Sequence, residues 1–243
     1  MAINATIIKN LSALRDVPDT ALEGLGRICV ARAFAKGEMI YLRGGAEGRV
    51  FLMLEGEVKL YLASGGQRIV IDIFRPGEFF GDMAFVNHPF GLPSEDYAES
   101  TQDTKLCVVT SDEFTRFIHA DTAFAMVLLV ALRNRLHAAQ SKIKDLAISS
   151  APTRLLNELI RLALSHGKEQ DGRYEIADRF THQQLAEMSG LARETVTKTL
   201  GELEKQGFIS YTPDHRVQLH VKTVIRECAE CLNLASLSEK PNM

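Results

Sequence analysis

Residues 181–210 read THQQLAEMSGLARETVTKTLGELEKQGFIS, and their spacing is that of two helices joined by a tight turn. Ala186 is small enough for two helices to cross closely, and Gly190 can adopt the positive φ that such a turn requires. Val196 places an apolar side chain where it can pack back on the first helix. The sequence therefore predicts a helix-turn-helix.

The start of the first helix is marked by Thr181, which is a favourable N-cap residue. Gln184, three positions later, completes a capping box, so the helix is expected to begin immediately after Thr181. Four leucines fill the remaining inward positions of the two helices: Leu185, Leu191, Leu200 and Leu203.

The second helix is expected to begin near Ala192 and to display polar side chains on one exposed side. Arg193 and Glu194 fall in its first turn, and Thr197 and Lys198 follow one turn later. An arginine there can donate two hydrogen bonds to guanine, and a glutamate can accept one from cytosine, each pair discriminating by about 1–3 kcal/mol. The same charged pair could instead be solvated on an ordinary helical hairpin and read no base.

A hairpin is expected after the two helices. The stretch FISYTPDHRVQLHV, residues 208–221, contains two strand-like runs around Pro213 and Asp214. His215 and Arg216 lie at its tip, where they could contact backbone phosphate. Together with the helices, this hairpin predicts a winged helix-turn-helix.

Residues 39–85 have the period of short strands separated by glycine pairs and by Pro-Gly. Gly65 and Gly66 can supply the positive φ of a tight hairpin. Strands resume at 105–110, so this part of the chain predicts an antiparallel sheet folded on itself. Residues 8–33 are expected to form a few small helices, and the polar stretch HGKEQDG at 166–172 is expected to form a loop.

A helix with a seven-residue repeat is expected from Asp121. Its apolar seam could pack on the chain's own sheet, or it could pair in parallel with the same helix of a second copy. Residues 149–152 then break the pattern, and Pro152 can be the first residue of the next helix, which indicates a hinge between domains. The seam consists of Ala125, Leu129, Leu132, Leu136, Ala139, Ile143 and Leu146.

Composition limits the class of protein. With 243 residues, 46% of them hydrophobic and 24% charged, the chain suits two globular domains. A net charge of −3 argues against a surface that coats nucleic acid everywhere and leaves room for a local basic face. The longest apolar stretch, 123–132, is too short to cross a bilayer, and the first ten residues lack the pattern of a signal peptide. We therefore expect a cytoplasmic protein with no membrane partner.

Cysteine usage supports the same location. The four cysteines are too scattered for the disulfide framework of a secreted domain, so reduced thiols are expected. They are Cys29, Cys107, Cys228 and Cys231.

Three stretches, LEGEVKLYL at 54–62, PGEFFGDMAF at 76–85 and RETVTKTLGELEKQGFIS at 193–210, give the chain a resemblance to the cyclic-AMP receptor protein and Fnr superfamily of bacterial transcription regulators. The resemblance implies an α+β fold of three parts. These are an N-terminal antiparallel β-roll that senses an effector (1–120), a long dimerisation helix (121–148) and a C-terminal winged helix-turn-helix (149–243).

The resemblance also implies partners and DNA contacts. The protein would bind double-stranded DNA as a homodimer and work with RNA polymerase. Arg193, Glu194 and Lys198 would read a TGTGA half-site, although Lys198 stands where the family has arginine. Thr181 and Gln183 would contact phosphate.

The effector pocket matches the family less well. In its cyclic-nucleotide binders, a Gly-Glu pair holds the ribose, an Arg-Ser pair holds the cyclic phosphate, and a Thr-Ser pair on the long helix meets the adenine. The corresponding pairs here are Gly81 with Asp82, Ser94 with Glu95, and Ala139 with Gln140. With Glu95 in place and no arginine, a phosphate would meet repulsion, so the expected effector is not cyclic AMP and its identity stays open.

Other sensing chemistries remain as alternatives. Haem-binding relatives place a histidine ligand where this chain has Met83, and His88 follows five residues later, either as a ligand or as a surface residue. An iron-sulfur cluster of the Fnr type is not expected, because only Cys29 lies near the N-terminus. Cys228 and Cys231 form a C-x-x-C that could have a redox or metal role, as in a haem- or redox-dependent gas-sensing regulator of the same family, or be incidental.

An enzyme is the rival from another class, because the β-roll resembles the cupins that hold a catalytic metal with clustered histidines. No such cluster occurs in the sheet segment, and no catalytic triad or phosphate loop is found. We expect no catalytic residues and no metal site.

Overall fold

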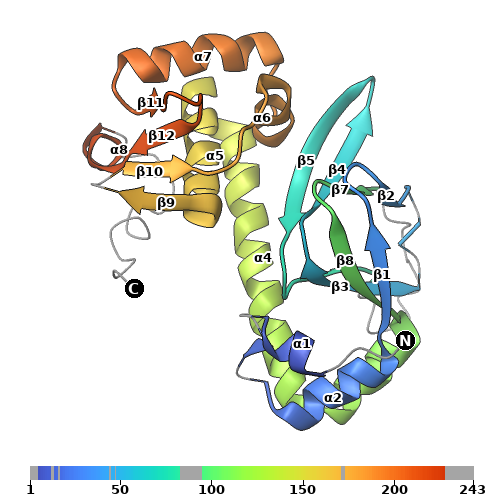
Figure 1. Ribbon diagram of the computed structural model, residues 1–243. Coiled ribbons are helices and arrows are strands. Elements are labelled where there is room, and N and C mark those ends of the chain that lie inside the picture. The colour runs from blue at the N-terminus through green and yellow to red at the C-terminus, as the bar shows by residue number, and fades with distance from the viewer. Residues whose placement is uncertain are drawn as a thin grey trace. The chain divides into compact units, whose positions relative to one another are not determined.

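The computed structural model describes residues 5–11, 14–15, 17–43, 45–46, 48–82, 95–170 and 173–227. Contacts within the chain divide it into two compact units, Met1–Ala139 and Gln140–Met243. Strands in antiparallel sheets and separate helices make up both units, as Figure 1 shows, so the expected α+β class is confirmed.

Two antiparallel sheets form the β-roll of the first unit (Figure 1). One has the order β1-β8-β3-β6 and the other the order β2-β7-β4-β5. Aromatic and aliphatic side chains from both sheets, including Phe51, Phe74 and Phe80, form a common core between them. The strands are β1 (Val30–Phe34), β2 (Met39–Tyr41), β3 (Arg49–Glu55), β4 (Val58–Ser64), β5 (Gln67–Phe74), β6 (Phe79–Gly81), β7 (Tyr97–Ser100) and β8 (Thr104–Thr110).

The β4–β5 hairpin turns at Gly65 and Gly66, whose φ angles of 58° and 77° confirm the expected tight turn. A register shift between Leu60 and Tyr61 then changes which side chains face the core. As a result, Leu62 is 41% exposed, whereas strict alternation would have placed it beside buried Leu60.

Helices cover the outer face of the sheet that contains β3. Phe114 and Phe124 are fully buried against it, and they pack at 6.3 Å between ring centroids. One expectation is corrected here, because 30–34 is a strand paired with β8 rather than part of a helix. Residues 111–120 form a helix that the sequence pattern did not indicate. The helices are α1 (Ala5–Lys9), α2 (Asp19–Ile28), α3 (Ser111–Ala120) and α4 (Thr122–Ile148).

Cys29 and Cys107 form a disulfide, which corrects the expectation of reduced thiols for this pair. Cys29 lies directly before β1 and Cys107 in β8, and the antiparallel pairing of these strands brings the Cα atoms to 5.4 Å. Both residues are buried, at 2% and 0% exposed. The bond therefore links two residues that lie 78 positions apart in the sequence and are both buried in the core.

The long helix α4 is buried along one side only. Phe124 and Leu128 pack into the core of the first unit, whereas Leu129, Leu136 and Ile143 of the seam are 57%, 60% and 64% exposed. The alternative that the whole seam packs on the chain's own sheet is therefore wrong. Among the described helices, none alone is long and apolar enough to span a membrane, although α3 and α4, bent by 116°, pass together on length and composition.

The second unit is a small helical domain with one antiparallel sheet of order β11-β12-β10-β9 (Figure 1). Residues 167–170, expected to be a loop, form β9 paired with β10. The elements after α4 are α5 (Ala151–His166), β9 (Gly167–Gln170), β10 (Arg173–Ile176), α6 (His182–Ser189), α7 (Arg193–Lys205), β11 (Ile209–Tyr211), β12 (Val217–His220) and α8 (Val221–Glu227).

The junction between α4 and α5 holds a buried polar cluster. Ser150 caps α5 by accepting from the Thr153 amide, and proline lies in the first turn, as expected. Asp145, in the last turns of α4, is 4% exposed and accepts a 2.7 Å hydrogen bond from the side chain of Asn157. The same carboxylate pairs with Arg161.

Candidate nucleic-acid interface and effector region

The entry to α6 has both hydrogen bonds of a capping box. The Gln184 amide donates to the Thr181 hydroxyl at 3.1 Å, and the Thr181 amide donates to the Gln184 side chain at 2.8 Å. Gly190 ends the helix in the left-handed region with φ 66°, where its amide donates to the carbonyl of Ala186. The predicted helix start and turn are confirmed.

The relative placement of α6 and α7 is fixed by apolar packing. Ala186 and Val196 are 4% and 0% exposed, and Leu185, Leu200 and Leu203 are also buried. Because these side chains come from both helices, they hold α7 at a set angle on α6.

The side of α7 that faces away from this apolar packing is polar and exposed. Arg193 and Glu194 lie in its first turn, and Thr197 and Lys198 follow on the same side, while Val196 points into the core. Lys198 also pairs with Glu202 one turn later at 3.8 Å, with its side chain still 80% exposed. The structure thus brings four candidate DNA-contacting residues onto one surface, which is the placement that a major groove requires.

The N-terminal end of α6 lies beside this surface. Gln183 is exposed and donates to Glu187 at 3.2 Å, and the Thr181 hydroxyl is occupied by the cap. His182, which sequence reasoning overlooked, lies 2.7 Å from the Thr197 hydroxyl through its Nδ1 atom. No local pattern pointed to this contact, because the two residues lie in different helices.

The wing is confirmed as β11 and β12, and its tip carries ion pairs rather than unpaired charge. Arg216 pairs with Asp214 and with Glu175, at 2.9 Å in both cases. The hydrogen bond from the Thr212 hydroxyl does most to lower the pKa of Asp214, and a backbone hydrogen bond and the nearby Arg216 and Arg179 lower it further. His215 takes a left-handed backbone conformation with φ 61°.

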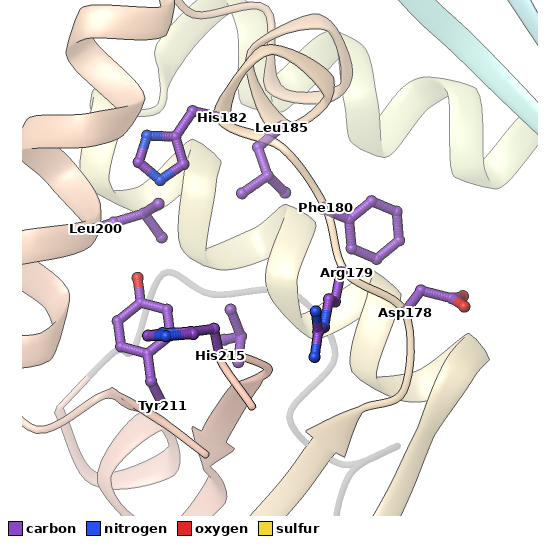
Figure 2. A pocket seen from close by; sticks show the side chains of 9 residues that line it. Asp178, Arg179, Phe180, His182, Leu185, Leu200, Tyr211 and His215 are labelled. Atoms are coloured by element: carbon purple, nitrogen blue, oxygen red, sulfur yellow. The ribbon is translucent and has the colours of Figure 1, made fainter. Parts of the chain in front are cut away.

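A cavity of about 260 Å³ lies between the wing and the two helices. Figure 2 shows His182 and Leu200 on one side of it and Tyr211 with His215 below them. Burial raises the pKa of Tyr211, and the nearby Glu204 carboxylate raises it further. The remaining lining residues are Asp178, Arg179, Phe180, Leu185 and Val217.

The described effector candidates in the β-roll have structural roles of their own. Gly81 has φ +97°, and a Cβ there would come within 2.5 Å of the Arg49 carbonyl, so the backbone itself requires glycine. Asp82 accepts a 2.8 Å hydrogen bond from the Gly48 amide. Glu95 pairs at the surface with Arg43 at 2.6 Å.

The remaining effector candidates are either exposed or outside the described residues. Ala139 and Gln140 are exposed on α4. Ser94 lies outside the described residues, as do Met83 and His88 of the haem alternative and the Cys228–Cys231 pair. Among the residues that the structure describes, no three histidine, cysteine, aspartate or glutamate side chains converge to hold a metal ion.

A cluster of aromatic rings in mutual contact occupies the interior of the β-roll. Phe80 lies 4.9 Å from Phe51 and 4.8 Å from Phe74 between ring centroids, and Tyr41 lies 5.8 Å from Phe51. Burial raises the pKa of Tyr41, whose hydroxyl donates to Asp96 at 3.1 Å.

Comparison with known proteins agrees with both halves of this arrangement. Residues 31–121 match the model of the cyclic nucleotide-binding domain, and residues 153–224 match the Crp-like helix-turn-helix domain. The transcriptional regulator SdrP of Thermus thermophilus is 31% identical over 183 residues, covering 73% of this chain and 83% of that relative. The CRP-like cAMP-activated global transcriptional regulator of Mycobacterium tuberculosis is 22% identical over 204 residues, covering 84% of this chain and 90% of that relative.

A solved structure agrees as well. The crystal structure of TTHA1359, a CRP/FNR family transcription regulator from Thermus thermophilus, superposes with a TM-score of 0.63 at 28% identity, covering 86% of this chain and 97% of that one. These relatives and domains are those of regulators and not of enzymes. The β-roll, the long helix and the winged helix-turn-helix, matched in this order to its relatives, show that the chain belongs to the Crp/Fnr family of transcription regulators.

Proposed function

We propose that this cytoplasmic regulator binds a TGTGA-like palindrome as a homodimer, acts with RNA polymerase, and is controlled through its β-roll by an effector other than cyclic AMP. The observation that carries the DNA-binding part is the exposed face of α7. Arg193, Glu194, Thr197 and Lys198 share this face, and Val196 anchors the opposite face in the core.

The dimer is supported by the unpaired side of α4. Leu129, Leu136 and Ile143 repeat at seven-residue spacing and are more than half exposed in the single chain. Apolar rows of this kind are stabilised by a second helix with the same repeat. Pairing through α4 would also present two recognition helices to successive major grooves of a palindrome.

An effector other than cyclic AMP is supported by the charges near the expected pocket. Glu95 would repel a cyclic phosphate, and its partner Arg43 is already neutralised by that pair. Asp82, the expected ribose ligand, is hydrogen-bonded to the Gly48 amide.

The test is fluorescence anisotropy of a labelled duplex that contains TGTGA and its inverted repeat, titrated with the full chain at fixed salt, because phosphate contacts make affinity salt-dependent. A scrambled duplex is the control, and each titration is run with and without cyclic AMP. Specific binding without the nucleotide supports the proposal. Specific binding only with cyclic AMP would overturn the effector part, and equal affinity for both duplexes would overturn the half-site.

A further inference from the structure

One hydrogen bond crosses from α6 to the exposed face of α7. Nδ1 of His182 lies 2.7 Å from Oγ1 of Thr197. Thr197 is exposed and His182 is partly exposed, so this contact lies outside the apolar packing that holds the two helices together. Its position on the recognition face, rather than in the core, points to a role in binding.

The direction of this hydrogen bond follows from the second partner of Thr197. Its hydroxyl also donates to the carbonyl of Arg193, one helical turn earlier, at 3.0 Å. A hydroxyl has only one proton, so the bond to His182 needs the proton of the imidazole Nδ1. The Thr197 oxygen is then left with acceptor capacity only.

This restriction changes what Thr197 can read. A freely rotating threonine hydroxyl can donate to or accept from a base edge, and it therefore discriminates poorly. Held as an acceptor, it can pair with the amino groups of adenine or cytosine but not with the oxygen of guanine or thymine. Its rotamer is also fixed by two partners, which sets the position of the methyl group.

We propose that His182 is a specificity-determining residue, which donates to Thr197 and thereby makes it select adenine or cytosine at one position of each half-site. The inference rests on the proposed DNA-binding function and adds a residue that reads no base itself.

The cavity behind His182 explains why the hydrogen bond is needed. His182, Leu185 and Leu200 line this cavity of about 260 Å³ (Figure 2). Because protein atoms do not fill the space on this side of the imidazole, close packing alone does not fix its orientation. The bond to Thr197 therefore restrains both side chains at once.

The experiment selects bound duplexes from a random-sequence library with the full chain and determines, by sequencing, the relative affinity for each base at every position. His182→Phe keeps a ring without the donor, and Thr197→Val removes the acceptor. At one position per half-site, each variant should lose a preference of about 2- to 10-fold for adenine or cytosine, the size of one net hydrogen bond. The double variant should lose no more than either single variant.

Two further variants separate this role from a structural one. His182→Asn places an amide donor near the position of Nδ1 and should restore the preference. Gln183→Ala should weaken binding to all sequences alike if it contacts phosphate.

An unchanged base preference in His182→Phe would overturn the inference and leave the proposed function intact. Equal losses on all sequences would also overturn it, because His182 would then be a backbone contact. A wild-type protein that enriches no sequence would overturn the proposed function together with the inference.

Discussion

The guanidinium of Arg135 on α4 forms an ion pair with the carboxylate of Asp72 on β5, with Nε and Nη2 at 3.1 and 3.0 Å from the same oxygen. The third nitrogen donates to the Phe79 carbonyl at 2.9 Å, and the Cζ atom lies over the Phe74 ring, 4.3 Å from its centroid. A single side chain thus connects the long helix to three positions in strands of the β-roll.

Arg135→Ala should lower the free energy of unfolding by about 1–2 kcal/mol, because it removes a partly exposed ion pair, a charged hydrogen bond and a ring contact. Arg135→Lys keeps the charge but loses the planar arrangement of three nitrogen donors. Its free energy of unfolding should therefore lie between that of the wild type and that of Arg135→Ala. Urea unfolding measures the difference. Arg133→Ala, exposed on the same helix, is the control and should stay within about 0.5 kcal/mol of the wild type. If Arg133→Ala and Arg135→Ala lose the same stability, the contacts of Arg135 with β5 and β6 do not stabilise the protein.

Reduction of the Cys29–Cys107 bond should destabilise the first unit by about 2–4 kcal/mol, because the bond restricts a long loop of the unfolded chain. The measurement is urea unfolding with and without a dithiol reductant in a Cys228→Ser, Cys231→Ser background, so that only this pair can respond. Two thiols labelled in the unfolded, unreduced protein would show that the bond does not form.

Gly81→Ala should destabilise the protein by more than about 3 kcal/mol, since a Cβ would meet both the Arg49 carbonyl and the Phe51 ring. Gly37→Ala is the matched control, because Gly37 also has positive φ, +83°, but has open space around it and should cost about 1–2 kcal/mol. Similar losses in thermal unfolding for the two variants would mean that Gly81 is not required by packing.

Leu136→Glu should weaken self-association by about 100-fold or more, because parallel pairing of α4 would bring two carboxylates together at the seam. Sedimentation equilibrium gives the dissociation constant. Asn134→Glu adds the same charge to an exposed position off the seam and should leave the constant nearly unchanged. A dimer that tolerates Leu136→Glu would place the interface elsewhere.

Arg193→Ala should cost about 1–3 kcal/mol of binding, and the loss should be confined to the guanine that Arg193 reads. Lys198→Ala tests whether Lys198, which stands where the family has arginine, also reads a base, and a loss at a different base position would support that role. Anisotropy with duplexes changed one base at a time makes the comparison. If Arg193→Ala weakens binding to specific and random duplexes equally, Arg193 contacts only the backbone.

Local signals explain what could be predicted from the sequence. The capping box at Thr181, the left-handed Gly190 and the buried Val196 act within one short segment, so the helix-turn-helix was foreseeable in detail. The Gly65–Gly66 turn is local in the same way.

What could not be predicted depends on partners distant in the chain. Strand β1 has an exposed, unpatterned sequence and exists because β8, more than 70 residues later, pairs with it. The same pairing brings Cys29 to Cys107. The bond between His182 and Thr197 likewise needs the crossing of two helices, which no residue spacing within one helix reveals.

The buried Asp145 has a practical consequence for cutting the protein into pieces. The side chain of Asn157, which is 1% exposed, donates to Asp145 on α4. A fragment that starts at Ala151 would lack the Asp145 carboxylate, which accepts from Asn157 and pairs with Arg161, and losing the charged hydrogen bond to Asn157 should cost about 1.5–3 kcal/mol. A fragment that starts at Gln140 retains Asp145 and therefore both of these contacts. The DNA-binding half of this chain should be expressed with the last turns of α4, from Gln140 onward, attached.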